Sequence, residues 1–232
     1  MFRTLTRFGR LFRMARILAR HDALLPREYE ARAPAGLRIL ARYAGTRARA
    51  MRQMAVGQRL AFAFEQMGPS AIKLGQFLAT RPDIMGTDIA RGLESLQDRL
   101  PPFATADAIR IVEHSLGKPL HTLFAEFGEP LAAASIAQVH LGVTTDDPPR
   151  RVAVKVLRPG IEAEFQRDFA AFRLAASMAE RFSAEARRLR LSAVVDTLAA
   201  SVALELDLRM EAAAASELAH NTRDDDDFRV PV

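Results

Sequence analysis

Lys155 lies at the end of a short run of β-forming residues, Val152-Ala153-Val154-Lys155. In protein kinases, a lysine on such a strand holds the α- and β-phosphates of ATP. A compact ammonium suits this task because it acts as a point charge toward phosphate oxygens. The run alone is weak evidence, since a lysine on an edge strand can equally reach into solvent. It marks Lys155 as a candidate phosphate ligand.

Small residues lie about one hairpin before this lysine: Ala132, Ala133, Ala134 and Ser135. A kinase carries a glycine-rich loop there, and alanine reaches positive φ less readily than glycine. Residues 136–144 and 151–157 are rich in β-formers and flank an Asp-Asp-Pro-Pro turn, which predicts a hairpin. The alternative is a tightly packed turn that binds no ligand.

Three carboxylates follow on a helix predicted for about residues 192–218: Glu205, Asp207 and Glu211. Asp207 and Glu211 are four residues apart and would share a helix face, whereas Glu205 and Asp207 would diverge. A carboxylate on a helix behind the lysine strand can form the Lys–Glu ion pair of a kinase. The alternative is a solvated acidic face beside Arg209.

A second lysine, Lys73, lies one helical turn before Gln76 in a helix predicted for about residues 70–80. Gly75 lies between them, and a glycine inside a helix costs about 1 kcal/mol relative to alanine. It therefore indicates close packing against a neighbour. Only Lys73, Lys118 and Lys155 are lysines among the 33 cationic residues, so each lysine can mark a place where a compact ammonium is needed.

The elements that must position these residues follow from charge and periodicity. Residues 1–52 hold 13 arginines and 3 acidic residues, whereas the rest of the chain is mildly acidic. Residues 2–20 alternate apolar and arginine faces, which is typical of a helix at an anionic membrane surface, of a transit peptide, or of a solvated helix packed on its own domain. The sequence contains no run of about 18 uncharged apolar residues that could span a membrane. The absence of cysteine excludes disulfides, cysteine zinc sites and thiol catalysis.

The order of these segments resembles the UbiB/ADCK family of atypical protein-kinase-like ATPases, which is associated with ubiquinone (coenzyme Q) biosynthesis. The resemblance runs from about Arg59 to Val232 and includes Arg158-Pro159-Gly160. It implies an α+β fold, in which a protein-kinase-like small lobe with a short antiparallel sheet follows a large N-terminal helical extension, without the C-terminal lobe. The predicted regions are basic amphipathic helices at 1–58, the helical extension at 59–127 and an incomplete small lobe at 128–232.

The resemblance also implies roles for individual residues. ATP or ADP, with Mg²⁺, would bind at residues of the alanine-rich loop and the strands: Ala132, Ala133, Ala134, Ser135, Val139, Ala153 and Lys155. Glu211 would pair with Lys155. A helix that folds over the nucleotide site and blocks protein substrates would carry Lys73, Gly75 and Gln76, and Lys73 would contact the acidic motif of Glu205 and Asp207.

Catalysis in this family also needs a His-x-Asp…Asn loop and a later metal-binding Asp. None of the five histidines opens such a loop, and the aspartates at 224–227 are better explained as a solvated acidic loop than as a metal site. We therefore expect a truncated or split family member that cannot turn over ATP alone, with no catalytic residue and no metal ligand of its own. Residues 228–232 would open a further strand.

The expected partners are an anionic membrane surface at residues 1–20, proteins of quinone biosynthesis, or a separately encoded C-terminal lobe. The expected location is cytoplasmic and peripheral to the inner membrane, or the mitochondrial matrix in a eukaryote. A non-catalytic membrane-surface module that supports lipid or quinone synthesis remains an alternative. Nucleic-acid binding is not favoured, because the basic segments lack interleaved aromatic residues and a zinc motif.

Overall fold

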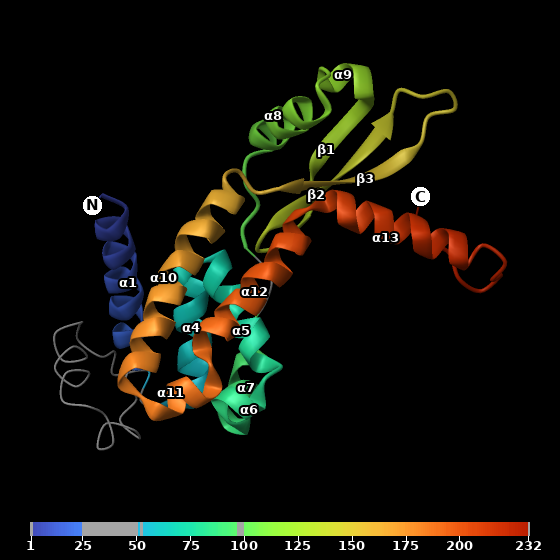
Figure 1. Ribbon diagram of the computed structural model, residues 1–232. Coiled ribbons are helices and arrows are strands. Elements are labelled where there is room, and N and C mark those ends of the chain that lie inside the picture. Colours follow the sequence, from blue (N-terminus) through green and yellow to red (C-terminus); the bar gives the residue numbers. More distant parts are fainter. Residues whose placement is uncertain (1, 25–50, 52, 97–99, 232) are drawn as a thin grey trace.

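The computed structural model describes residues 2–24, 51, 53–96 and 100–231. It consists of a helical unit, a sheet unit and one projecting helix (Figure 1). The helical unit contains α1 (Phe2–Arg20), α4 (Val56–Met67), α5 (Pro69–Ala79), α6 (Pro82–Met85), α7 (Thr87–Leu93), α10 (Ile161–Phe182), α11 (Ala184–Leu189) and α12 (Leu191–Leu206). The sheet unit contains α8 (Thr105–Leu116), α9 (Leu120–Leu123), β1 (Phe124–Ala133), β2 (Ala137–Thr144) and β3 (Arg151–Leu157). The projecting helix is α13 (Leu208–Asn221).

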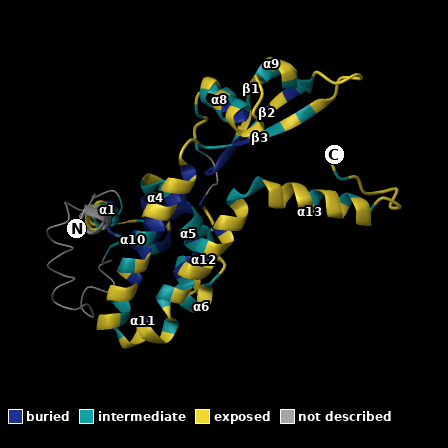
Figure 2. Ribbon diagram, turned by 45° about the horizontal axis from the view of Figure 1, so that its top comes forward, coloured by how far each residue is buried: buried dark blue, intermediate teal, exposed yellow. Residues whose placement is uncertain are grey.

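The core of the helical unit forms where α4, α5, α10 and α12 meet. On α10, Phe165, Phe169 and Phe172 recur at helical spacing and are buried, and neighbouring rings lie 5.6 and 5.9 Å apart. Burying one such side chain stabilises a fold by about 1.5–3 kcal/mol. Buried residues accordingly gather between these helices in Figure 2. Ile136, directly before β2, and Ala137, the first residue of β2, belong to the same apolar cluster and join the sheet unit to the helical unit.

The predicted amphipathic helix at residues 2–20 is confirmed as α1, and it packs on α10 and α4. Arg10 forms an ion pair with Asp168 of α10. Just after α1, the Asp22 carboxylate accepts from the Arg59 guanidinium of α4 at 2.6 Å, and both side chains are almost fully buried. Removing one partner of such a buried pair destabilises the fold, because the other charge is left buried without compensation. The pair therefore attaches the end of the first helix to the helical unit.

The sheet is antiparallel in the order β1-β2-β3, and the hairpin expected between residues 136 and 157 is confirmed as β2 and β3. One face of the sheet is covered by α8, with Ala108, Val112 and Val156 forming a second small core. β1 was not predicted, because Gly128 and Pro130 interrupt its pattern. It begins at Phe124, four residues before the expected start of the small lobe.

Several predicted helix boundaries were wrong. The helix expected at 192–218 is two helices, because the Asp207 backbone leaves helical geometry and its side chain accepts the Arg209 N–H at 3.1 Å. Asp207 and Glu211 therefore do not share one continuous helix face. The sequence also predicts that Thr105 caps the helix that follows it. Instead, Ala104 occupies the cap position of α8, and the Thr105 hydroxyl donates to Glu129 at 2.5 Å.

Other boundaries differ near the ends of the described segments. The sequence also predicts a helix from residue 88 to 98. The observed helix α7 ends at Leu93, and residues 97 and 98 lie outside the described part of the chain. The sequence also predicts helix across residues 35–66, which have few helix breakers. Residues 35–50 and 52 lie outside the described part of the chain, and within the rest the helix is α4. Residues 228–231 form no strand, because no strand of the sheet lies beside them to supply hydrogen-bond partners.

Candidate functional site

The three strands present a row of predicted nucleotide-binding residues on one face of the sheet. Ala132 of β1 lies opposite Val139 of β2, and Val139 lies opposite Lys155 of β3. Residues directly opposite each other in an antiparallel sheet point to the same face. Ala153 shares that face because it is two residues from Lys155 on the same strand. We call this surface, formed by Ala132, Val139, Ala153 and Lys155, the open face.

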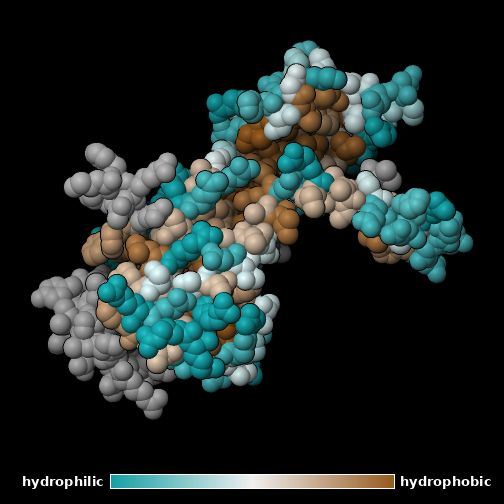
Figure 3. All heavy atoms as spheres, viewed as in Figure 1, coloured by the Kyte–Doolittle hydropathy of each residue, from teal (hydrophilic) through white to brown (hydrophobic). Residues whose placement is uncertain are grey.

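The open face lies opposite α8, because Val156 points to the other side and packs against α8. Its apolar small side chains flank a single ammonium. Such a surface suits a ligand with a flat apolar part and an anionic part. Figure 3 shows hydrophobic side chains gathered between the sheet unit and the junction of α12 with α13.

Lys155 and Glu211 are brought together across the open face. The Lys155 ammonium donates to Glu211 Oε2 at 2.6 Å, and 36% and 59% of the two side chains are exposed. α13, which carries Glu211 in its first turn, contributes no buried residue. An exposed pair of this kind contributes about 0–1 kcal/mol to stability. The pair therefore orients the lysine without being needed for folding.

Lys73 and Glu205 form a second pair, between α5 and the last turn of α12. The Lys73 ammonium donates to Glu205 Oε1 at 2.5 Å, and the lysine side chain is only 12% exposed. Lys73 thus contacts the predicted acidic motif through Glu205. Gln76 is half-buried on the same helix, one turn after Lys73.

Asp207, the second acidic residue of that motif, pairs with Arg209. The guanidinium Nε and Nη2 of Arg209 each donate to the Asp207 carboxylate at 2.8 Å. These hydrogen bonds hold the pKa of the Asp207 carboxyl below its usual range. Since Asp207 also begins α13, it sets where the helix bearing Glu211 starts.

Gly75 is required by close packing, as the sequence suggested. A Cβ at this position would lie 2.2 Å from Leu96 Cδ1 and 2.5 Å from Phe64 Cδ2. Atoms essentially never approach so closely, so a larger residue would have to displace these side chains. The glycine thereby lets α5, with Lys73, lie tightly against α4.

The alanine-rich residues form the end of β1 and the turn into β2. Ala132 and Ala133 end β1, and residues 134–136 form the turn. Ser135 is fully buried. We call residues 134–136 the alanine-rich turn.

Sequence reasoning missed two polar side chains that hold this turn and its surroundings. Arg158, directly after β3, donates to the carbonyls of Ala134 and Pro101. Gln138 exchanges two hydrogen bonds with the Phe103 backbone, and its amide lies 2.8 Å from His140 Nε2. An arginine directly after a strand was the available signal for Arg158. The burial of Gln138 could not be predicted from the alternation of residues along the strand.

The fold and this geometry agree with the comparison to known families. Residues 95–232, more than half of the chain, match the model of the ABC1 atypical kinase-like domain. The chain belongs to the ABC1 atypical kinase-like family. The predicted resemblance is thereby confirmed, as is the predicted α+β combination of helices with a short antiparallel sheet. The matched ABC1 region contains the whole open face together with Glu205 and Glu211.

Curated members of this family are similar along most of the chain. A probable protein kinase UbiB from Marinobacter nauticus is 40% identical over 220 residues, which cover 94% of this chain and 39% of the relative. A protein of the same name from Aeromonas salmonicida is 39% identical over 227 residues, covering 97% of this chain and 41% of the relative. One from Azotobacter vinelandii is 46% identical over 164 residues, covering 70% and 30%. The chain thus spans about two fifths or less of the length of these relatives.

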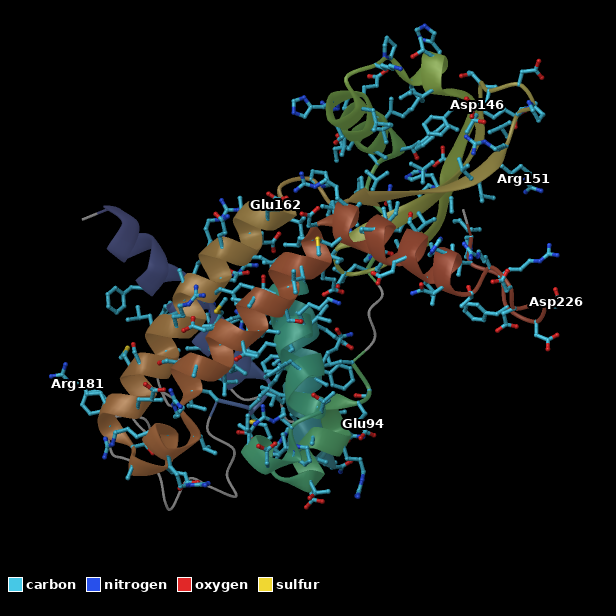
Figure 4. All side chains as sticks on the ribbon, turned by 45° about the vertical axis from the view of Figure 1, so that its right-hand side comes forward. Glu94, Asp146, Arg151, Glu162, Arg181 and Asp226 are labelled. Atoms are coloured by element: carbon cyan, nitrogen blue, oxygen red, sulfur yellow. The ribbon has the colours of Figure 1, made fainter. Side chains whose placement is uncertain are left out.

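The ABC1 kinase-like family implies ATP and Mg²⁺ as ligands. The open face fits the nucleotide, because an oriented ammonium lies beside small apolar side chains. Within the described ranges, no group of three or more His, Asp or Glu side chains could hold a metal ion. The aspartates at 224–227 lie in an exposed loop, and Figure 4 shows Asp226 beyond the end of α13, pointing away from the molecule.

No helix among the residues that the structure describes is both long and apolar enough to cross a membrane.

Proposed function

We propose that this chain is the nucleotide-binding portion of a UbiB-type atypical kinase or ATPase that acts in ubiquinone biosynthesis. ATP or ADP would lie on the open face, with its phosphates at Lys155 and its base against Val139 and Ala153. The observation that carries the proposal is the Lys155–Glu211 ion pair, 2.6 Å long, at one end of the row of Ala132, Val139 and Lys155. A kinase-type lysine requires such a carboxylate from a neighbouring helix.

Replacement of Lys155 by alanine tests this proposal. Losing a charge-assisted hydrogen bond to phosphate costs about 1.5–3 kcal/mol, so Lys155→Ala should weaken binding of a fluorescent ATP analogue about 10- to 100-fold. The matched control is Lys118→Ala, since Lys118 is an exposed lysine at the end of α8, outside the open face. Equal affinity of the Lys155→Ala variant and the unmodified chain would exclude the proposed site.

We also propose that the 232-residue polypeptide binds nucleotide without turning it over. Its sequence supplies no His-x-Asp…Asn segment, and the described residues form no cluster of metal-ligating side chains. Kinases need both a catalytic His-x-Asp…Asn loop and metal-ligating side chains for phosphoryl transfer. The measurement is steady-state phosphate release from ATP and Mg²⁺. We expect the unmodified chain to release phosphate no faster than the Lys155→Ala variant. A rate clearly above that of the variant would refute the proposal.

Binding to an anionic membrane surface is a second candidate function, supported by the outer face of α1. Phe8 and Phe12 are 52% and 58% exposed, and Arg13, Arg16 and Arg20 are exposed on the same helix. The inner face is occupied, since Ile17 is buried and Arg10 pairs with Asp168. Exposed aromatic side chains among arginines suit the boundary between acidic headgroups and acyl chains.

Flotation with liposomes tests this second function. Vesicles containing acidic phospholipid should carry the chain at low salt and release it at high salt, because the arginine contribution is screened. Phe8→Ser/Phe12→Ser should abolish flotation and keep the fold. Point variants are needed because deletion of residues 1–20 would also remove buried Ile17 and Ala19. Flotation of the double variant at the unmodified level would exclude α1 as the contact.

A further inference from the structure

Arg158 connects the alanine-rich turn to a segment far away in the sequence. Its guanidinium Nε and Nη2 both donate to the Ala134 carbonyl, at 3.0 and 2.8 Å. Nη2 also donates to the Pro101 carbonyl at 2.9 Å, and the guanidinium carbon lies 5.7 Å from the centre of the Phe103 ring. One side chain thus binds the turn and residues 100–103, which lead into α8 and which we call the connector.

The turn is held on its other side as well. The Arg158 backbone N–H donates to the Ile136 carbonyl at 2.9 Å, and the Ile136 side chain is buried in the core of the helical unit. The Ala134 N–H donates to the Ala137 carbonyl at 2.8 Å. Both ends of the three-residue turn are fixed. Within it, the direction of the Ala134 carbonyl, which belongs to the peptide unit between Ala134 and Ser135, depends on the Arg158 guanidinium.

We infer that Arg158 is a positioning residue for nucleotide binding, because it fixes the peptide unit between Ala134 and Ser135. This inference rests on the proposed nucleotide site. A peptide unit is planar, so its carbonyl and its N–H point in opposite directions. Holding the Ala134 carbonyl at the guanidinium keeps this negative end of the peptide dipole from turning toward bound phosphates. An alanine-rich turn needs such a restraint, since it lies where kinases place a glycine-rich loop.

Arginine is suited to this role in a way that lysine is not. Its planar fork presents several N–H donors in fixed directions, whereas an ammonium is a compact point charge. Here the fork reaches the Ala134 carbonyl and the carbonyls of residues 100 and 101, while its flat face lies near Phe103. Arg158→Lys would keep the charge and lose this arrangement.

The connector has a second attachment that does not involve Arg158. Gln138 accepts from the Phe103 N–H at 3.0 Å and donates to the Phe103 carbonyl at 3.3 Å. The connector should therefore stay in place when Arg158 is changed. We expect Arg158→Lys and Arg158→Gln to unfold cooperatively, with a changed turn as the main consequence.

The test compares ligands that carry phosphates with one that does not. Titration calorimetry with ATP, ADP and adenosine is carried out on the 232-residue chain and on Arg158→Lys and Arg158→Gln. We expect ATP and ADP affinity to fall about tenfold and adenosine affinity to change less than twofold. Arg150→Lys is the matched control, because Arg150 is an exposed arginine of the same hairpin that pairs with Asp146 at 2.7 Å. Its ATP affinity should equal that of the unmodified chain.

The outcomes separate this inference from the proposed function. No ATP binding by the unmodified chain would overturn the proposed nucleotide site and this role with it. ATP binding that is unchanged in both Arg158 variants, or an equal loss for ATP and adenosine, would overturn the positioning role alone. Loss of cooperative unfolding in both variants would show that Arg158 holds the fold as a whole, and would also overturn a role confined to the turn. Faster amide hydrogen exchange at residues 134–136 in the variants, without nucleotide, is the structural readout expected.

Discussion

Single residues of three kinds build the candidate site: ammonium groups, carboxylates and small residues. Lys155 meets Glu211, and Lys73 meets Glu205, each through one short contact. The carboxylates lie six residues apart, on either side of the break at Asp207. The two lysines are therefore linked through a single short stretch of chain, although they come from different units of the fold.

Gly75→Ala is expected to destabilise the chain in spite of the better helix propensity of alanine. The gain in propensity is about 1 kcal/mol, whereas forcing a methyl group against Leu96 and Phe64 costs about 1–3 kcal/mol or more. Chemical denaturation should show a lower free energy of unfolding. Gly9→Ala is the control, since a Cβ at Gly9 in α1 would meet nothing within 4 Å, and it should stabilise the chain slightly. A Gly75→Ala variant as stable as the unmodified chain would contradict this packing.

The resemblance to the UbiB/ADCK family implied that Lys155 would pair with Glu211 and that Lys73 would contact the acidic motif of Glu205 and Asp207. The structure brings Lys155 to Glu211 and Lys73 to Glu205. Asp207 instead pairs with Arg209. The role of Arg158 could not be predicted in this way, since its partners are backbone carbonyls whose position depends on the tertiary fold. Every residue has a backbone carbonyl, so the residue types do not reveal which carbonyl accepts a hydrogen bond from a side chain.

Among the described helices longer than four residues, α13 is distinctive because none of its residues is buried. Its position depends on its first turn, where Asp207 accepts the Arg209 N–H and Glu211 binds Lys155. The sequence predicted one helix through this region, because Leu204, Leu208 and Met210 continue an apolar pattern without glycine or proline. The break depends on how Asp207 and Arg209 bind each other, which periodicity does not reveal.

The start of α13 should depend on pH through Asp207. Arg209 lowers the pKa of this carboxyl in the folded chain, so its contribution is complete above about pH 4, the ordinary value for aspartate, and is lost as the pH falls through the lowered value. The Asp207 carboxyl shift followed by NMR should titrate below the ordinary aspartate value of about 4. Asp207→Ala should speed amide exchange in the first turn of α13, whereas Asp207→Asn should retain the cap and lose the pH dependence. Titration of Asp207 at an ordinary pKa would contradict its pairing with Arg209.

At the scale of the whole molecule, the described residues form the helical unit, the sheet unit and the projecting helix α13, and the two units meet at a few points. One is Ile136, a residue of the alanine-rich turn whose side chain is 3% exposed in the core of the helical unit. Another is the connector at residues 100–103, which Arg158 and Gln138 attach to the turn and to β2. The turn that faces the proposed nucleotide site is thus also a joint between the units. The sequence indicated a helical part and a strand part, but not this joint, because Ile136 looks like an ordinary strand residue.

Ile136→Ala should therefore affect both stability and binding. Removing a buried isoleucine side chain costs about 2–5 kcal/mol, and the turn would lose its contact with the helical core. We expect a lower denaturation midpoint together with weaker binding of ATP. Leu131→Ala is the control, since Leu131 on β1 is 65% exposed, and it should change stability by less than about 1 kcal/mol. If Ile136→Ala binds ATP as tightly as the unmodified chain at a temperature where the variant remains folded, the contact of Ile136 with the helical core does not support the nucleotide site.

The pairing of two lysines with carboxylates has a practical consequence for covalent footprinting. Acylating reagents modify amines, and the side chains of this chain offer only three: Lys73 and Lys155 in ion pairs, and Lys118 exposed at the end of α8. Mass spectrometry of partly acylated protein would report the reactivity of Lys155 relative to Lys118 within the same molecule. The unmodified polypeptide thus contains its own internal standard for occupancy of the open face.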